Sequence, residues 1–395
     1  MSTVADARAR HPSARTPPAQ ATGSRLFVAL AFLIAVFNLL GLVMVMSASS
    51  VVALDDYGSS WYFVARQATW AAAGTVALVV VARVDYHRWR RLSGPFVLVA
   101  IGLLGLVLVI GTGANGATRW IGVGPLTFQP SELAKLALVL WVADLLARRA
   151  ASMHNTRATL RPVIVVLAVM ATLVMLQPNL GTTIVVAAIA LTVCFVGGAP
   201  LGPLTRWATF GMGAAVALAL AAPYRRARVL AFLDPWADPM DKGYQNIQSL
   251  VGLAEGGVAG KGLGAGTAKW GFLPYAHSDF IFAVIGEELG LVGAVAVVGL
   301  FVLLGVLGVR VALHAPDRFG LLLAVGVTSW FCVQAFVNIG AVIGILPITG
   351  VPLPFVSAGG SSLVFGMAGA GLLLSVARHA TDRVLPPRAA GGRSR

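Results

Sequence analysis

Acidic and basic residues gather in one polar segment of an otherwise apolar chain, residues 224–290. This segment holds seven of the fifteen acids, three of the four lysines and three closely spaced arginines. Segments that only cross a bilayer do not need charges, so chemistry is expected here. A carboxylate can transfer a proton, and neighbouring cations can bind an anion. The acids are Asp234, Asp238, Asp241, Glu255, Asp279, Glu287 and Glu288.

Asp279 stands where the polar segment returns to an apolar run, in the sequence HSDFIF. Desolvation by Phe280, Ile281 and Phe282 raises the pKa of a carboxyl group, whereas nearby cations and a helix N-terminus lower that pKa. A general base for a hydroxyl works best with a pKa near the operating pH, so we expect a net upward shift. The alternative is an N-cap aspartate that accepts backbone N–H groups of the following helix.

Arg225, Arg226 and Arg228 open the same segment. Guanidinium groups bind phosphate through charge-assisted, often bidentate hydrogen bonds. Cations on the outer side of a membrane oppose the usual insertion bias, which favours a bound anionic ligand as the reason for them. The alternatives are anchoring to anionic phospholipid or simple tolerance at the interface.

Composition places these residues in an integral membrane protein. The 395 residues are 58% hydrophobic and only 11% charged, with mean hydropathy +0.85. An ordinary soluble domain carries about 25% charged residues. We predict an all-α fold with about ten membrane spans and one large structured extracytoplasmic loop, 223–278. The predicted spans are 26–46, 61–81, 92–110, 131–146, 163–176, 181–196, 209–222, 280–309, 321–345 and 359–376.

The net charge of +14 follows this topology rather than indicating nucleic acid. With a cytoplasmic N-terminus, 20 of the 29 basic residues fall on the inner side, as the positive-inside rule requires. Both termini are therefore predicted to be cytoplasmic. Residues 1–24 are predicted to form a disordered tail, 25–378 the membrane domain and 379–395 a basic tail.

The outer connection 111–135 contains turn residues and ends in a helix start. Glu132 and Lys135 are three residues apart on that helix, so they can form a structural ion pair that orients it. Arg119 is either an interfacial anchor or a contact to a lipid head group.

The last outer connection, 346–362, holds three prolines and three glycines and cannot be a regular helix. Irregular backbone at membrane depth is tolerated where it is buried in protein or faces a water-filled cavity. We therefore expect a cavity near the outer leaflet, with Ser357, Ser361 and Ser362 as hydrogen-bond partners.

Five motifs, in order along residues 26–378, resemble the SEDS family of FtsW, RodA and their sporulation homologue. Within that family, GYQNIQSL and Lys269 are more similar to FtsW than to RodA. The motifs are NGATRWIGVGPLTFQPSELAKL, QPNLGT, GYQNIQSLVGLAEGGVAGKGLGAG, LPYAHSDFIFAVIGEELG and ITGVPLPFVSAGGSSL.

This resemblance implies a ten-span glycosyltransferase that polymerises lipid II into peptidoglycan strands at the bacterial cytoplasmic membrane. It implies a class B penicillin-binding protein and other divisome membrane proteins as partners, no nucleic acid, and a location at the division septum. The resemblance implies that Asp279 stands at the position of the family's catalytic acidic residue. A divalent cation, Mg²⁺ or Mn²⁺, is left open. The expected substrate-binding residues are Arg225, Arg226, Arg228, Lys269, His277, Arg119, Gln248, Ser361 and Ser362.

The chain departs from the family pattern at Asn179, Tyr275 and Ala358, where an acid, Glu or Asn, and an aromatic residue are common. Asn179 leaves in doubt any role for a carboxylate at that position. None of the three departures affects Asp279.

Other function classes stay open beside the division-specific polymerase. One is an elongation-type, RodA-like polymerase, another is a lipid II flippase, and the third is a non-catalytic divisome scaffold. A flippase would need polar residues at mid-bilayer and often shows repeated halves. No clear repeat is present, and Asp144 is expected to be a water-facing residue at a helix end.

Overall fold

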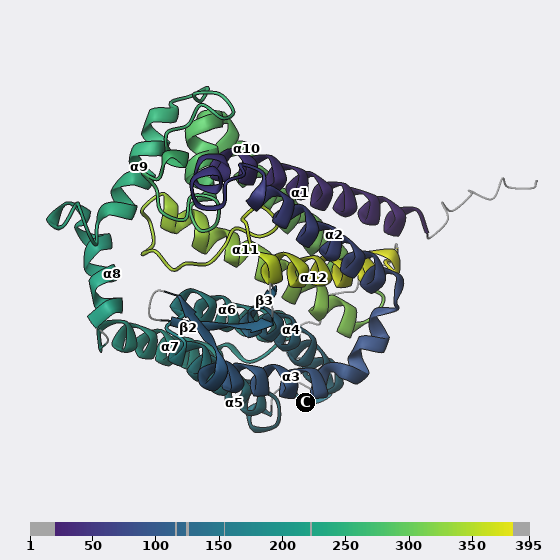
Figure 1. The fold of residues 1–395 in the computed structure, drawn as a ribbon. Coiled ribbons are helices and arrows are strands. Elements are labelled where there is room, and N and C mark those ends of the chain that lie inside the picture. Colours follow the sequence, from purple (N-terminus) through teal and green to yellow (C-terminus); the bar gives the residue numbers. More distant parts are fainter. Residues whose placement is uncertain (1–19, 115–116, 124–125, 154, 222, 382–395) are drawn as a thin grey trace, which may run out of the picture.

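The computed structural model describes residues 20–114, 117–123, 126–153, 155–221 and 223–381. Nearly all of this part is helical, and the long helices form one bundle (Figure 1). The helices are α1 (Gln20–Tyr57), α2 (Tyr62–Arg83), α3 (Tyr86–Ile110), α4 (Pro130–Arg148), α5 (Thr156–Leu176), α6 (Leu180–Val196), α7 (Leu201–Ala221), α8 (Pro223–Leu233), α9 (Tyr244–Gly256), α10 (Ile281–Leu313), α11 (Arg318–Val342) and α12 (Gly360–Arg378).

A small sheet is the exception to the predicted all-α class. Strands β1 (Thr112–Ala114), β2 (Ala117–Val123) and β3 (Leu126–Phe128) pair antiparallel in the order β1-β2-β3. β-branched and aromatic residues such as Thr118, Trp120 and Ile121 favour these short strands, and the segment was expected only as a structured loop. The sheet leads directly into α4, which begins at Pro130, inside the connection where a helix start was predicted.

Each of the ten predicted spans overlaps one helix. Seven of these, α1, α2, α3, α5, α10, α11 and α12, are long and apolar enough to cross a membrane by length and composition. Helix α6 is a shorter apolar helix, and α4 carries charged residues at both ends. The chain is therefore a multi-pass, mainly helical membrane protein, and the count of ten stays a prediction.

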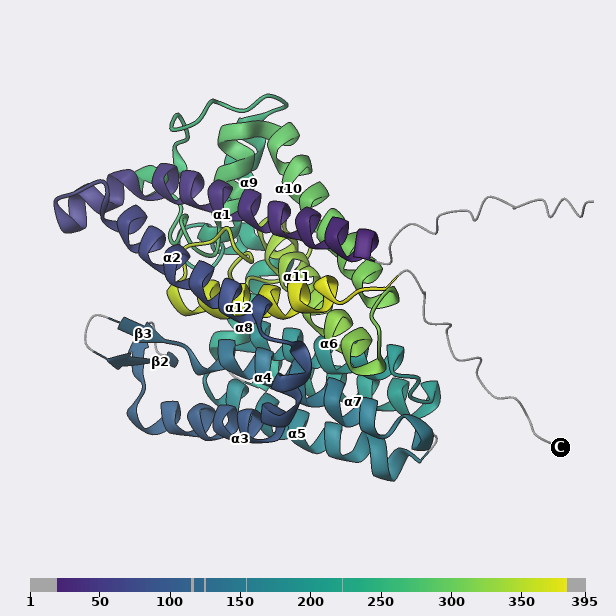
Figure 2. The same ribbon diagram turned by 90° about the vertical axis from the view of Figure 1, so that its right-hand side faces the viewer.

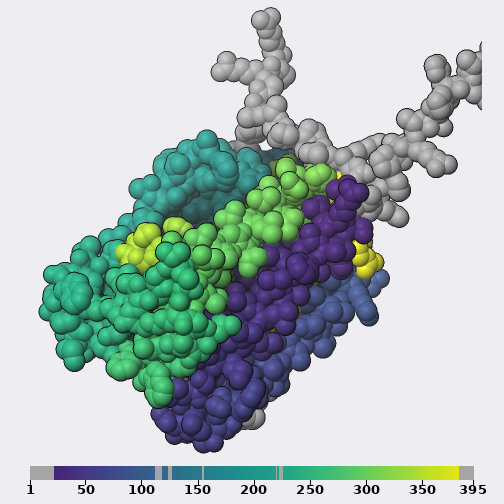
Figure 3. Space-filling view, turned by 90° about the horizontal axis from the view of Figure 1, so that it is seen from above, coloured from purple at the N-terminus to yellow at the C-terminus, as the bar shows by residue number. Residues whose placement is uncertain are grey.

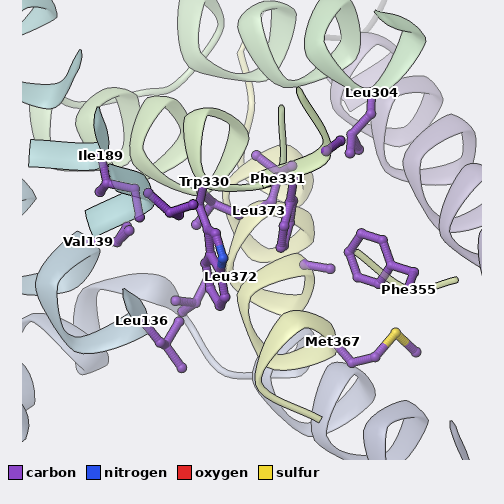
Figure 4. Packing of buried hydrophobic residues seen from close by; sticks show 14 of the residues in the cluster. Leu136, Val139, Ile189, Leu304, Trp330, Phe331, Phe355, Met367, Leu372 and Leu373 are labelled. Atoms are coloured by element: carbon purple, nitrogen blue, oxygen red, sulfur yellow. The ribbon is translucent and has the colours of Figure 1, made fainter. Parts of the chain in front are cut away.

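The buried centre of the bundle is formed by α4, α11 and α12. Figures 1 and 2 show these helices between α3, α5 and α7 on one side and α1 and α10 on the other. Trp330 and Phe331 of α11 pack there against leucines of α12 (Figure 4). The Phe331 ring also lies 4.8 Å from the ring of Phe355. This aromatic contact joins the last irregular connection to the core.

The two described chain ends lie together, at the opposite end of the bundle from α8 and α9 (Figure 1). A Cβ on Gly23 would lie 3.0 Å from the carbonyl oxygens of Ala377 and Ala380, so α1 begins against the end of α12. Figure 3 shows α1 running beside α10 along the same face. This common placement of the ends agrees with an even number of crossings.

Segment 223–278, predicted as one loop, contains α8 and α9, and its later part is hydrogen-bonded to α10. The backbone N–H groups of Lys261 and Gly262 donate to the carbonyl oxygens of Glu287 and Glu288, at 3.0 and 2.9 Å. Gly290 has a φ of +68°, and a Cβ there would meet the Gly260 nitrogen at 2.3 Å. Only glycine permits both this conformation and this close approach.

Asp144 does not face water as expected. It is 5% exposed, and its carboxylate accepts hydrogen bonds from Arg90 Nε at 2.6 Å, Arg148 Nε at 2.8 Å and Ser93 Oγ at 2.8 Å. The packing of α3 against α4 supplies Arg90 and Ser93, which lie far from Asp144 in sequence. Asp144 is thus a paired structural residue of this helix contact.

Candidate active site

A cavity of about 360 Å³ lies where α2, the small sheet, α8 and the last irregular connection meet. It takes residues from segments that are far apart in sequence, and six predicted site residues are among them. These six are Arg119, Arg228, His277, Asp279, Ser361 and Ser362. The expectation of a cavity beside the connection 346–362 is therefore confirmed.

Asp279 is held by its main chain just before α10. Its carbonyl oxygen accepts a hydrogen bond from Asn338 Nδ2 at 2.8 Å. The preceding carbonyl, that of Ser278, accepts one from Ser357 Oγ at 2.6 Å. Helix α10 has Phe280 as its N-cap residue, with no side-chain cap hydrogen bond. The Asp279 carboxylate is therefore not the cap of this helix.

Two opposing effects act on the Asp279 carboxyl group. The residue as a whole is half-buried, and desolvation of its carboxyl group raises its pKa above the ordinary value. The positive charges of Arg228 and Arg119 lower the pKa by a smaller amount, so the net direction is upward. The two arginines thus act on the carboxylate electrostatically, and burial is the stronger effect.

Arg119 lies on β2 and is oriented by the turn before α6. Its Nε donates to the carbonyl oxygen of Gln177 at 3.0 Å, and its Nη2 donates to that of Pro178. Its Nη1 lies on the side of Gly350, because a Cβ built there would be 3.9 Å from Nη1 and 3.5 Å from Asp279 Oδ2. The guanidinium group and the carboxylate therefore face the same short piece of backbone.

Arg228 reaches the site from α8, where its Nη1 donates to the carbonyl oxygen of Ile348 at 3.3 Å. His277 also lines the cavity, and its ring centroid lies 4.6 Å from that of Phe63. Burial lowers the pKa of the His277 imidazole below its usual value, so the ring is neutral at pH 7. The site therefore presents one carboxyl group, a neutral imidazole and three arginines, of which Arg119 and Arg228 donate to backbone carbonyl oxygens and Arg66 also lines the cavity.

The serines of the last connection serve its geometry. Ser361 Oγ accepts from the backbone N–H of Gln129 at 3.2 Å, which ties the start of α12 to the start of α4. Ser362 Oγ donates to the carbonyl oxygen of Gly359 at 3.2 Å. Ser357, also expected as a partner, is buried and holds the Asp279 segment as described above.

Several predicted residues lie apart from the cavity. Lys269 is bonded to the carbonyl oxygen of Gly264 on the exposed side of the loop, and neither Gln248 nor the exposed Arg226 is among the lining residues. The side chain of Arg225 lies outside the described residues. Of the arginine cluster, Arg228 is the member that the described structure brings to Asp279.

Among the polar or aromatic lining residues that were not assigned to the site from the sequence, six come from α2, α9 and turns. Three come from one turn of α2, where polar side chains near the start of an apolar helix were a usable signal. The other three come from turns and from α9, and only the tertiary fold brings them together. The six are Arg66, Gln67, Trp70, Gln129, Gln245 and Tyr275.

The three departures from the family pattern have structural roles. Asn179 is the N-cap of α6, its side chain accepting from the backbone N–H of Thr182 at 3.2 Å. Tyr275 lines the cavity with a φ of +59°, a conformation that non-glycine residues rarely adopt. The backbone N–H of Ala358 donates to the His277 carbonyl oxygen at 2.9 Å.

The predicted pair of Glu132 and Lys135 is present and buried, with Lys135 Nζ 2.8 Å from Glu132 Oε1. Lys135 also donates to Gln334 Oε1 at 2.7 Å, and Gln334 Nε2 donates to the carbonyl oxygen of Pro352 at 2.8 Å. The ion pair thus supports the connection that borders the cavity, without lining the cavity itself.

Most acids of the polar segment have structural partners instead of lining the cavity. Glu287 accepts from Lys261 Nζ at 2.9 Å and from Thr267 Oγ1 at 2.7 Å, and Glu288 accepts from Ser47 Oγ at 2.6 Å. Among the described lining residues, Asp279 is the only carboxylate. In the described part of the chain, no cluster of three or more His, Cys, Asp or Glu residues could hold a metal ion.

The model of a family of cell cycle proteins, FtsW/RodA/SpoVE, matches residues 27–382. "Probable peptidoglycan glycosyltransferase FtsW" of Geobacter metallireducens is 41% identical over 338 residues, 85% of this chain and 90% of that protein. "Stage V sporulation protein E" of Bacillus subtilis is 40% identical, over 86% of this chain and 93% of that protein.

Among solved structures, a chain from a study of the structural coordination of polymerization and crosslinking by a peptidoglycan synthase complex has a TM-score of 0.73. It is 35% identical, and the match covers 88% of this chain and 96% of that chain. Sequence and fold therefore agree over nearly the same length. On these matches, the chain belongs to the FtsW, RodA and SpoVE family of cell cycle proteins.

Proposed function

We propose that this chain is a peptidoglycan glycosyltransferase that polymerises lipid II into β1→4 glycan strands, with Asp279 as its general base. The name of the Geobacter metallireducens relative, a probable peptidoglycan glycosyltransferase 41% identical over 85% of this chain, supports the hexosyltransferase class. The observation that carries the assignment of Asp279 is its position as the only carboxylate among the described residues that line the cavity, which it shares with Arg119 and Arg228. Burial raises the pKa of this carboxyl group, which agrees with the assignment. A carboxylate whose pKa is raised by burial, beside Arg119 and Arg228, suits proton abstraction next to a phosphate leaving group.

The reaction is one displacement at the anomeric carbon. The oxygen of the acceptor C4 hydroxyl attacks C1 of the donor sugar, and the Asp279 carboxylate takes the proton of that hydroxyl. The bond from C1 to the polyprenyl pyrophosphate breaks, and the pyrophosphate leaves with the electron pair. An α-linked donor gives a β link by inversion, which needs one base, whereas retention would need a second carboxylate about 5 Å away. Asp279, the only carboxylate among the described lining residues, fits inversion.

Arg119 and Arg228 are assigned to the pyrophosphate of the donor. Both side chains are oriented by backbone carbonyl oxygens, so they do not have to be ordered when substrate binds. The negative charge of the leaving pyrophosphate is stabilised by these guanidinium groups. His277 is neutral at pH 7, so it adds hydrogen-bonding capacity without positive charge.

The setting of the reaction is the outer face of the bacterial cytoplasmic membrane, at the division septum, with both chain termini in the cytoplasm. The clustering of the chain ends opposite α8 and α9 supports this orientation. The proposed partners are a class B penicillin-binding protein and other divisome membrane proteins. The match to a chain of a peptidoglycan synthase complex supports it, and the FtsW names among the relatives support the division role.

Asp279→Asn tests the assignment, since asparagine keeps the shape but cannot accept the proton. We expect the purified variant to fold and to make no glycan from lipid II, with or without its partner protein. Asp241→Asn is the matched control, an exposed carboxylate of the same segment outside the cavity, and should polymerise normally. Glycan ladders of normal length from Asp279→Asn would remove Asp279 from the reaction. No ladders from wild-type protein with its partner would favour a flippase or scaffold.

A further inference from the structure

Asn338 contacts the main chain of the proposed base from the middle of the bundle. It lies on α11 and is 2% exposed. Its Nδ2 donates to the carbonyl oxygen of Asp279 and to that of Val351, each at 2.8 Å. Both partners can only accept, so the amide nitrogen must be the atom that faces them. Both hydrogens of this amide are therefore committed.

The other end of the same amide is unsatisfied. Asn338 Oδ1 is buried and has no hydrogen-bond partner in the described structure. A buried amide oxygen without a partner is unfavourable, and a leucine of similar shape would avoid it. The two donated hydrogen bonds therefore explain why an amide, rather than an apolar side chain, stands here.

The second partner of Asn338 borders the reacting groups. Val351 follows Gly350, which has a φ of +69°. A Cβ on Gly350 would be 3.5 Å from Asp279 Oδ2 and 3.9 Å from Arg119 Nη1. One amide thus joins the backbone that carries the carboxylate to the backbone that faces it. Helix α11, with its buried aromatic residues, fixes both to the core.

We propose that Asn338 is a positioning residue, which sets the distance between the Asp279 carboxylate and the Gly350 turn beside Arg119. The proposal rests on Asp279 being the general base. Asp279 precedes the first turn of α10, and the Gly350 turn is irregular. Neither segment is therefore held by the repeating backbone hydrogen bonds of a helix or a sheet. A misplacement of about 1 Å at a reacting group can lower a rate about 100-fold.

Asn338→Leu removes both donors and the unpaired oxygen while keeping a similar volume. We expect kcat for lipid II polymerisation to fall about 100-fold, with KM changed less than about threefold. We also expect the acidic limb of the pH–rate profile to move to lower pH. A loosened Asp279 segment admits water, and desolvation is the main cause of the raised pKa. A purely structural role would reduce the yield of folded protein without moving kcat or this limb.

Asn38→Leu is the matched control. Asn38 on α1 also uses its Nδ2 twice, toward Ile34 O at 2.8 Å and Met367 Sδ at 3.3 Å, and its Oδ1 is also unpaired. Asn38 does not line the cavity, so the kcat of the Asn38→Leu variant should stay near the wild-type value. Asn338→Ala is the second test variant, to be used if the leucine variant does not fold. We expect the same changes in kcat and KM from it.

Each outcome decides the proposal. Asn338 variants with kcat and pH profile near wild type, beside an inactive Asp279→Asn, would overturn the positioning role and leave the proposed base intact. A raised KM at unchanged kcat would also overturn it. An active Asp279→Asn would remove the base and the positioning role together. Failure of both Asn338 variants to fold, when Asn38→Leu folds, would assign Asn338 to folding alone.

Discussion

Replacing Lys135 with methionine tests how the buried ion pair on α4 contributes to stability. Methionine keeps an unbranched side chain of similar length but removes the positive charge. Lys135 Nζ lies 2.8 Å from Glu132 Oε1, and these two side chains are 1% and 2% exposed. Glu132 Oε2 already has no hydrogen-bond partner in the described structure. The variant therefore leaves a buried carboxylate without the cation that compensates it.

The expected size follows from this geometry. At 2.8 Å and an effective dielectric constant near 20, the attraction is about 6 kcal/mol. Breaking a buried pair on one side costs about 3–5 kcal/mol, so we expect a loss of that size in the free energy of unfolding. Gln334 Oε1 keeps its bond from Trp330 Nε1 at 2.8 Å, so the loss falls mainly on Glu132.

A double-mutant cycle in detergent-solubilised protein measures this loss by denaturant unfolding. The double variant Glu132→Gln with Lys135→Met carries no charge at either position of this pair, and we expect its free energy of unfolding to be within about 2 kcal/mol of wild type. Lys242→Met is the control: it breaks an exposed pair with Asp238 at 3.9 Å and should cost less than about 1 kcal/mol. A double variant that loses the sum of both single effects would refute the energetic coupling of Glu132 and Lys135.

Three further outcomes are expected. The raised pKa of Asp279 means that its protonated, inactive form persists above pH 3.8, so activity should fall on the acidic side at a higher pH than an ordinary aspartate would give. Between pH 3.8 and the raised pKa, the folded state binds more protons than the unfolded state. The stability of wild type relative to Asp279→Asn should therefore decrease as the pH rises through this range. An unchanged stability difference across this range would contradict the upward shift of the Asp279 pKa. For topology, cysteines at positions 238 and 388 should react with impermeant reagents from opposite sides of the membrane. Labelling of both from outside in intact cells would contradict the orientation.

The helices that overlap the predicted spans could be predicted from the sequence because each is specified locally, whereas α8 and α9 were included in the predicted loop 223–278. Apolar runs of span length predicted ten segments, and the end of the connection 111–135 was recognised as a helix start. The small sheet was missed because its strands are short and separated by glycine, so no alternating pattern is long enough to detect. The roles of Glu287 and Asp144 were also not predictable, because their partners come from distant segments.

Candidate site residues were predictable where a motif and a boundary coincided. Asp279 stands at the change from polar to apolar sequence, and Arg119 lies in a distinctive outer connection. Lys269 is close to Asp279 in sequence, yet it bonds to its own loop. Arg66 comes from α2, more than two hundred residues away, and still lines the cavity. Distance along the chain therefore gives little information about which cations face the carboxylate.

The division of labour among the acids explains how one carboxylate can be kept reactive. Glu287 has several donors and Asp144 has two arginines, so these charges are compensated and serve the packing of helices. Asp279 is desolvated more strongly than Arg228 and Arg119 compensate, and this raises its pKa. Such a group destabilises the folded state at neutral pH, and the surrounding structure must hold it in place. Ser357 and Asn338 do so through main-chain carbonyl oxygens, which leaves the carboxylate itself available for a substrate hydroxyl.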